Sequence, residues 1–420
     1  MAHRLSETTC KVDIIKLSLN KSQLEQCRLL RIESGRCYSD MLAAHVESRK
    51  DKWLSVGELK AMFKKQYNLH SQSVQAIAEK IDANIESART NREREFKSTG
   101  KIQTEYPFKS KTFYNVIWKR LGIQVKEGQI HLSNGVKQNP LVISLPYRYR
   151  DSNIALAELV WDADTYYLHI TVDTGIIPPA FIRQVKTAGI DLGEIHIASC
   201  TIDTGETLIV SGRLLRSVKQ LRNKKHAKYK QRMSRCKDGS RKQKKLKQSE
   251  RKSSSKFVRQ QRDILHKASR QIVEFCHKNN VAMIATGDVR DIADGVNLGK
   301  KCNQKLSQWA HGQFYNYVKS KSRAYGMNNR YLNEAYSSKT CSICGHVKSS
   351  SVKGRVYKCS NCKGIVHRDG NGSANICSKD RFGSYSQVQV SDIKYLQPVY
   401  IRQRCSSPSE AGQVAISCRL

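Results

Sequence analysis

Apolar residues in the first part of the chain follow two patterns, one typical of strands and one typical of helices. Residues 12–19 alternate between apolar and polar, which predicts a strand, and from Lys21 onward apolar residues recur at helical spacing. Residues 53–97 are charged and helical in pattern, and alternation returns at Leu141–Leu145 and at Tyr166–Val172. This part of the chain is therefore expected to be a β-rich unit interrupted by a helical insertion.

A different pattern begins after Ile176–Pro179, a proline-containing stretch typical of a linker. Short apolar runs follow at 188–192, 195–202 and 207–210, and their closeness in sequence predicts a meander of three strands. Further along, a helix with an apolar stripe leads into an expected strand at 281–285. The second half of the chain is thus expected to be an α/β domain.

Positive charge dominates the composition, with 74 Lys and Arg against 36 Asp and Glu and a formal net charge of +38. A nucleic acid is the expected partner, because basic side chains bind phosphates by displacing counterions. Residues 213–270 contain 23 of these basic residues and three acids, and we expect two long helices joined near Asp238–Ser240. The alternative is a partly disordered charged run. Candidate nucleic-acid contacts are Arg213, Arg216, Lys224, Lys225, Lys228, Arg232, Arg241, Lys244, Lys245 and Arg259.

Neither a membrane-spanning segment nor a secretory signal is predicted, because no apolar run is long enough and residues 1–10 lack an apolar core. We expect a soluble intracellular protein with no membrane partner. Its default location is a bacterial cytoplasm, in association with the nucleoid, or the nucleus if the host is eukaryotic. The oligomeric state does not follow from the sequence.

Four of the 14 cysteines form two close pairs, Cys341/Cys344 and Cys359/Cys362. Two Cys-x-x-Cys pairs at this separation can supply four thiolates to one tetrahedral Zn²⁺ ion. Such a closed site would stabilise a zinc ribbon and leave no position for catalysis. The alternatives are a redox dithiol, or His346 in place of one thiolate.

Two aspartates are placed where a carboxylate could bind Mg²⁺. Asp191 ends an apolar strand in Gly189–Gly193, where glycines leave room beside it, and Asp369 precedes a run of small residues that can begin a helix. From the residues alone, Asp191 could equally be a turn residue and Asp369 a helix N-cap.

The order of motifs resembles that of the TnpB family, transposon-encoded RNA-guided nucleases whose relatives include Fanzor proteins and miniature type V CRISPR effectors. The resemblance covers roughly residues 180–377. It is carried by Gly189–Gly193, Arg262–Lys267, Leu306–Trp309, Ser337–Gly345, Asp369 and Asn371. It implies an RNase H-like (RuvC) nuclease domain in which three acids bind two Mg²⁺ ions for phosphodiester hydrolysis. By motif, Asp191 is the first acid and Asp369 the third.

The second acid departs from the family pattern, because the position where relatives carry Glu is Gly287, followed by Asp288. Glu334 follows the next expected strand and could reach the same metals from there, as in TnpB and Fanzor proteins whose glutamate has moved. We predict Glu334, with Asp288 as the weaker alternative and Asp291 and Asp294 weaker still. Either carboxylate could instead be structural.

The resemblance also implies a guide RNA, a double-stranded DNA target and a basic channel for the heteroduplex. We therefore predict an RNA-guided DNA endonuclease encoded by an insertion-sequence element. The alternatives are an RNA-guided repressor without nuclease activity, and a structure-directed nuclease or transposase that uses no guide. The expected domains are a wedge-like unit (1–175) with a helical recognition insertion (about 21–120), a RuvC-like domain (176–336 and 367–380), a zinc ribbon (337–366) and a mobile tail (381–420).

Overall fold

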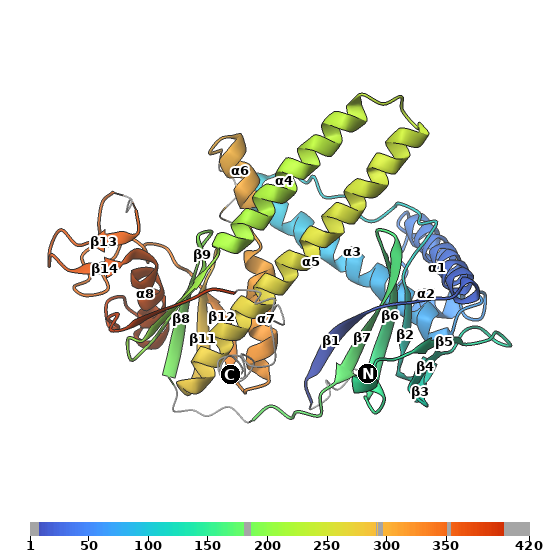
Figure 1. Cartoon of the computed structure of the whole chain (residues 1–420), viewed down its shortest axis with the longest axis horizontal. Helices are drawn as coiled ribbons and strands as arrows, with labels where there is room; N and C mark the ends of the chain where they lie inside the picture. Colours follow the sequence, from blue (N-terminus) through green and yellow to red (C-terminus); the bar gives the residue numbers. More distant parts are fainter. Residues whose placement is uncertain (1–7, 180–185, 291, 293–296, 351–353, 399–420) are drawn as a thin grey trace, which may run out of the picture. The chain divides into compact units, whose positions relative to one another are not determined.

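The protein is seen here as a computed structural model (Figure 1), which divides into two compact units, Met1–Ile177 and Pro178–Leu420. The division falls within the expected linker. The structure describes residues 8–179, 186–290, 292, 297–350 and 354–398. Within these residues, no helix has both the length and the apolar character needed to span a bilayer.

The first unit has two antiparallel sheets and three helices. Its larger sheet has the strand order β1-β7-β6-β2, and its smaller sheet the order β3-β4-β5. The strands are β1 (Cys10–Lys16), β2 (Val116–Lys119), β3 (Ile123–Lys126), β4 (Gln129–Leu132), β5 (Leu141–Ser144), β6 (Ile154–Asp162) and β7 (Thr165–Asp173), with short 3₁₀ turns at Arg120–Gly122 and Tyr147–Tyr149.

Three helices, α1 (Lys21–Ser48), α2 (Val56–Met62) and α3 (Ser71–Thr99), are inserted between β1 and β2. The side chain of Asn20 accepts a hydrogen bond from the backbone N–H of Gln23, and the side chain of Gln23 accepts one from the backbone N–H of Asn20. Helix α1 therefore begins with a capping box. The last inserted helix ends at Thr99, and Trp118 in β2 is fully buried in the sheet core. This buried indole donates to the Ser133 carbonyl.

The second unit is built on a six-stranded mixed sheet with the order β12-β11-β8-β9-β10-β15. Strands β8, β9 and β10 form the predicted antiparallel meander, and β11 and β12 add in parallel beside β8. This strand order confirms the RNase H-like fold. The strands are β8 (Lys186–Leu192), β9 (His196–Ile202), β10 (Thr207–Ser211), β11 (Val281–Gly287), β12 (Asn328–Leu332) and β15 (Ile393–Leu396).

Helices cover both faces of this sheet. On one face, Ala188, Ile190 and Leu192 share a core with apolar residues of α5 (Arg241–Lys278). The opposite face of β8 carries Gly189 and Asp191 and packs against α8 (Arg368–Phe382). A Cβ at Gly189 would overlap the backbone of α8, so glycine is needed for this close packing. The remaining elements are α6 (Lys300–Ser307), α7 (His311–Arg323), and a ribbon hairpin of β13 (Val356–Lys358) and β14 (Ile365–His367).

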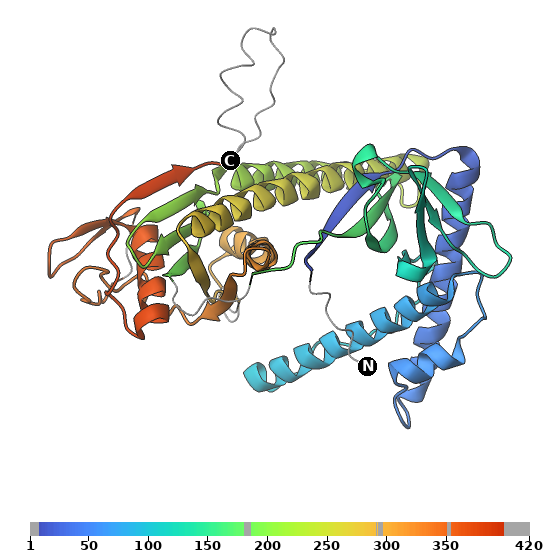
Figure 2. The ribbon, with the colours of Figure 1, turned by 90° about the horizontal axis from the view of Figure 1, so that it is seen from below.

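The basic segment forms a helical hairpin of α4 (Arg213–Ser234) and α5 (Figure 2). The turn uses Gly239 at a φ of 71°, and the Ser240 side chain caps α5 by accepting from the Gln243 N–H. Met233, Leu246 and Phe257 are buried along the hairpin. These apolar contacts explain how so charged a segment folds, and the predicted pair of basic helices is confirmed.

The prediction of a mobile tail from residue 381 is wrong for the part that the structure describes. Residues 393–396 form β15, which pairs in parallel with β10, and Val388 is buried against Ala374 and Cys377. The tail lacks periodicity because β15 is an exposed edge strand whose backbone hydrogen bonds, rather than a buried apolar face, hold it to the sheet. Residues 399–420 lie outside the described residues.

Candidate active site

Three neighbouring strands bring Asp191, Gly287 and the residues before Glu334 into one row. Ile190 of β8 pairs with Thr286 of β11, and Gly287 pairs with Leu332 at the end of β12. Glu334 follows two residues after Leu332. The central strand, β11, thus presents glycine between Asp191 on β8 and the segment after β12 that carries Glu334.

The carboxylate of Glu334 lies over Gly287. A Cβ at Gly287 would lie closer to the Glu334 Oε2 than two unbonded atoms ever approach. That oxygen is buried and has no hydrogen-bond partner among the described residues. Buried polar atoms are nearly always paired, so this oxygen is suited to an external partner such as a cation.

The surroundings of Asp191 and Glu334 disfavour the ionised form of both carboxyls. Burial raises the pKa of Asp191 well above its usual value, and the charges of Glu334 and Asp369 raise it further. Burial also raises the pKa of Glu334, with a smaller contribution from Asp288. A bound cation would oppose these shifts by favouring the ionised form of both carboxyls.

A second glycine makes room beside Asp191. A Cβ at Gly372, in the first turns of α8, would lie 2.6 Å from the Asp191 Oδ2.

Helix α8 is connected to the ribbon by Asn371. The Asn371 side chain accepts from the Ser342 N–H and donates to the Thr340 carbonyl, both at 2.8 Å. Asn375 also donates to the Thr340 carbonyl. These buried asparagines were not singled out for this role at the sequence level, because their partners are about 30 residues away.

The third acid, Asp369, is turned toward basic groups. Its Oδ2 lies 2.6 Å from His196 Nδ1 and accepts from Arg355 Nη1 at 3.0 Å. Burial opposes ionisation of Asp369, but the His196 hydrogen bond and the Arg355 charge outweigh it and lower the pKa. Within the described ranges, His196, His367 and Asp369 have ligand atoms within 4.8 Å of one another, whereas the three predicted acids do not form such a group.

Asp288 is paired within its own loop. Its two oxygens accept from Arg290 Nε at 2.8 Å and Nη2 at 2.6 Å, and the Arg290 guanidinium lies over the Tyr331 ring. These hydrogen bonds outweigh burial and lower the pKa of Asp288. Asp288 therefore already pairs with the guanidinium of Arg290. Glu194 is also paired, with Arg216 and Lys305.

Asp291 and Asp294, the weakest predicted alternatives for the second acid, lie outside the described residues.

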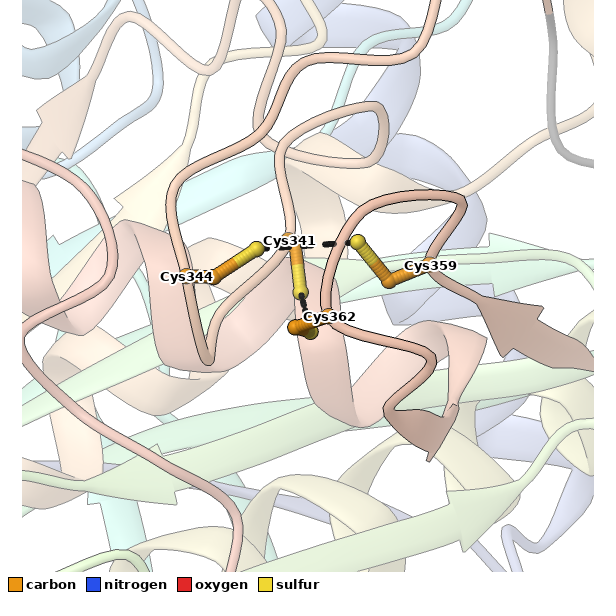
Figure 3. Close-up of side chains that lie close together, drawn as sticks. All are labelled: Cys341, Cys344, Cys359 and Cys362. Atoms are coloured by element: carbon orange, nitrogen blue, oxygen red, sulfur yellow. Dashed lines mark hydrogen bonds between the residues drawn. The ribbon is translucent and has the colours of Figure 1, made fainter.

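The four predicted cysteines converge (Figure 3). Cys341 and Cys362 have sulfurs 3.8 Å apart, Cys344 and Cys359 have sulfurs 3.6 Å apart, and all four sulfurs lie within 4.8 Å of one another. A Zn²⁺ ion with four thiolates at about 2.3 Å requires sulfur separations of about 3.8 Å. His346 is not part of this group and contacts the Ser360 hydroxyl at 3.0 Å. The geometry could hold zinc without rearrangement.

The candidate nucleic-acid contacts are arranged along the hairpin. All ten lie on α4 or α5, and nine are exposed. Arg216 is the exception, because it is half-buried and paired with Glu194. The exposed basic side chains are therefore available to a phosphate backbone.

Two family models match the parts of the chain that contain the site. Residues 169–293 match a family model described as a probable transposase, and residues 311–376 match the Cas12f1-like TNB domain. A TnpB-like protein of Methanocaldococcus jannaschii is 25% identical over 252 residues, which is 59% of this chain and 86% of that protein. The chain is thus similar to TnpB-like proteins over more than half of its length.

Two further proteins resemble parts of this chain. A TnpB-like protein of Acanthamoeba polyphaga mimivirus is 26% identical over 137 residues, which is 33% of this chain and 26% of that protein. The cryo-EM structure of a Cas12f1–sgRNA–target DNA complex is similar in fold, with a TM-score of 0.58 and 17% identity, over 86% of this chain and 83% of that chain. The transposase match contains Asp191, and the TNB match contains Glu334, Asp369 and the four cysteines.

Proposed function

We propose that this chain is an RNA-guided DNA endonuclease, encoded by an insertion-sequence element, whose catalytic acids are Asp191, Glu334 and Asp369. The observation that carries the proposal is the placement of Glu334 over Gly287, next to Asp191. A glutamate at position 287 would enter the same space from the neighbouring strand. Glu334 would thus supply the carboxylate that position 287 lacks.

The residues present fit Mg²⁺, which binds carboxylate oxygens. The buried Glu334 oxygen has no protein partner, and glycines stand where a Cβ would crowd Glu334 and Asp191. When bound, two Mg²⁺ ions would activate water and stabilise the leaving oxygen. Asp191 would hold the ions from β8 and Glu334 from the segment that follows β12, and Asp369 would join them once its carboxylate is released from Arg355.

We also propose that one Zn²⁺ ion is held by Cys341, Cys344, Cys359 and Cys362. The ribbon lies between Glu334 and Asp369 in the sequence, and Asn371 and Asn375 connect it to α8. Zinc would thus position the helix that carries Asp369 while taking no part in the chemistry.

The proposed partners are a guide RNA and a double-stranded DNA target. Guide pairing would provide sequence specificity, and the basic hairpin would bind the phosphates of the RNA or heteroduplex. The support for these partners is the net charge of +38, the row of exposed basic residues and the similarity to TnpB-like proteins.

The experiment has two stages. The protein is first expressed with its native flanking DNA and purified in high salt, and the bound RNA is sequenced. A discrete RNA with a constant scaffold and an end derived from the element boundary supports guidance, whereas heterogeneous RNA contradicts it. Plasmid cleavage is then measured with Mg²⁺ or EDTA for the wild type, Glu334→Gln and Asp288→Asn.

Each result of the second stage selects one function. Mg²⁺-dependent cleavage that Glu334→Gln abolishes and Asp288→Asn retains supports the proposed nuclease. Guided binding without cleavage in any condition supports the RNA-guided repressor, a role that the pairing of Asp369 with His196 and Arg355 would favour. Cleavage without a guide identifies a structure-directed nuclease or transposase.

A further inference from the structure

A cluster of two histidines and one aspartate lies beside the acid site. His196 begins β9, His367 ends β14, and Asp369 lies in the first turn of α8. Their ligand atoms all lie within 4.8 Å of one another, and the two imidazole rings have centroids 5.4 Å apart. The ring of Tyr395 in β15 flanks both histidines, at 6.5 Å and 5.9 Å. Elements distant in sequence thus converge on one small cluster of nitrogen and oxygen donors.

One nitrogen in this cluster has no partner. His367 Nδ1 is buried and makes no hydrogen bond among the described residues. Buried polar atoms without a partner are destabilising, so they are rare unless an ion or water binds them. His196 Nδ1, by contrast, contacts Asp369 Oδ2 at 2.6 Å. The cluster therefore contains one free ring nitrogen and one that already shares the carboxylate.

We propose that His196, His367 and Asp369 bind a divalent first-row transition metal ion such as Mn²⁺ or Co²⁺. Two imidazole nitrogens and one carboxylate oxygen suit such ions, whereas Mg²⁺ strongly prefers oxygen ligands. Binding would give His367 Nδ1 a partner and would replace the proton between His196 and Asp369. The site is separate from the acid pair Asp191 and Glu334 but shares Asp369 with the proposed nuclease, so one side chain would serve two metal environments.

Arg355 is the main obstacle to a cation at this site. Its Nη1 lies 3.0 Å from the Asp369 oxygen that contacts His196. The Arg355 side chain is 40% exposed, against 16% for Asp369, so it can move into solvent without opening the core. Removing its charge should strengthen metal binding. A site in which His196 served only to orient Asp369 would give no direct nitrogen coordination after that change.

The test uses the full-length, zinc-loaded protein and Mn²⁺ as the probe, because zinc keeps the thiolate cluster occupied. Free Mn²⁺ is counted by electron paramagnetic resonance, and bound Mn²⁺ is examined by pulsed methods for ¹⁴N coupling from a coordinated imidazole. Wild-type protein should show this coupling, and the double variant His196→Ala/His367→Ala should lose it. Arg355→Ala should retain the coupling and bind at least about threefold more tightly.

Two controls identify the source of the signal. His226 pairs with Glu250 on the basic hairpin, so His226→Ala should leave the nitrogen coupling unchanged. Glu334→Gln should also retain it, because Glu334 is not a member of the cluster. Zinc content and thermal unfolding show whether the double variant is folded, and the single variant His367→Gln, which retains a polar side chain of similar size, replaces it if not.

The inference is overturned if wild-type protein shows no ¹⁴N coupling, if the coupling persists in the double variant, or if His226→Ala removes it. Cleavage supported by Mg²⁺ alone is measured on the same preparations. A protein that cleaves DNA without nitrogen coupling contradicts this site and leaves the proposed nuclease intact. Nitrogen coupling in a protein that never cleaves supports the site and contradicts the nuclease.

Discussion

The carboxylate of Glu334 fills the space that a side chain at Gly287 would need. Gly287 at the end of β11 and Glu334 just after the end of β12 therefore compete for one place beside Asp191. A Cβ at Gly287 would also meet Ile376 Cδ1 at 3.0 Å, a flexible contact that can adjust. The main barrier to a larger residue at Gly287 is thus Glu334 itself.

The two positions should therefore compensate each other. Gly287→Glu alone should destabilise the protein and inactivate it, because two carboxylates would be forced together. Glu334→Ala alone should reduce cleavage by about 10²-fold or more, because a proposed metal ligand is lost. The double variant Gly287→Glu/Glu334→Ala should recover part of the cleavage rate. Plasmid cleavage rates measure this, and a double variant no more active than Glu334→Ala would contradict the shared position.

The small residue at Gly372 should matter for activity more than for folding. Gly372→Ala places a methyl group 2.6 Å from the Asp191 Oδ2, so we expect weaker Mg²⁺ binding and slower cleavage by about tenfold or more. Gly312→Ala in α7 is the matched control, because nothing lies within 4 Å of its Cβ. Alanine is the better helix former by about 1 kcal/mol, so this control should be as active and at least as stable. Equal cleavage by the two variants would argue against crowding at Asp191.

Asp191 should destabilise the metal-free protein at neutral pH. Burial raises its pKa in the folded state, so the folded protein favours the protonated form. The favourable contribution is complete below the unfolded-state pKa and is lost as pH rises through the raised folded-state pKa. Asp191→Asn avoids this loss and should have a higher Tm than wild type in EDTA, with a difference that grows as pH rises. Thermal unfolding across pH measures it, and each 1 kcal/mol corresponds to about 2–4 °C for a domain of this size.

Mg²⁺ should reverse that ranking, because only the wild type offers the full carboxylate set. A difference in Tm that is independent of pH and of Mg²⁺ would show that Asp191 carries no buried charge.

Loss of zinc should disturb Asp369 through the ribbon. Cys344→Ser removes a thiol whose pKa is lowered to about 6, chiefly by a backbone hydrogen bond from His346, and which is therefore readily ionised for a metal. We expect loss of the bound zinc, local unfolding around residues 340–365 and slower cleavage. Cys302→Ser is the control, because Cys302 is exposed and outside the cluster. Zinc content and hydrogen exchange measure the effect, and full zinc occupancy in Cys344→Ser would contradict the assignment.

The hairpin should contribute to affinity through charge. Replacing the exposed pair Lys244 and Lys245 by Gln should weaken RNA or heteroduplex binding and reduce the dependence of log Kd on log salt by up to about two. Neither lysine is buried, so the unfolding transition should not move. Glu250→Gln, at a residue that pairs with His226, is a control that changes the charge in the opposite sense. Binding curves over a range of salt concentrations test the contribution, and an unchanged slope would exclude phosphate contact by this pair.

Local patterns in the sequence predicted much of the second unit. Strands β8, β9 and β10 could be predicted because each is a short apolar run. The cysteine cluster could be predicted from the spacing of its two pairs. The choice between Glu334 and Asp288 could not be settled locally, because it depends on the register between β11 and β12 and on the pairing of Asp288 with Arg290. The approach of His196 to Asp369 joins positions 173 residues apart, and no spacing signals it.

Strand β15 has a consequence for how the protein is made. It covers the outer edge of β10 with parallel pairing, yet it is the last of the described strands to leave the ribosome. During most of the synthesis of the second unit, the backbone groups along that edge of β10 are open to pairing with another chain. A chain that stops before Ile393 keeps both Asp191 and Asp369 but leaves the edge open permanently. We expect such truncations to be lost through aggregation before their chemistry can be tested, which a comparison of soluble and insoluble fractions would reveal.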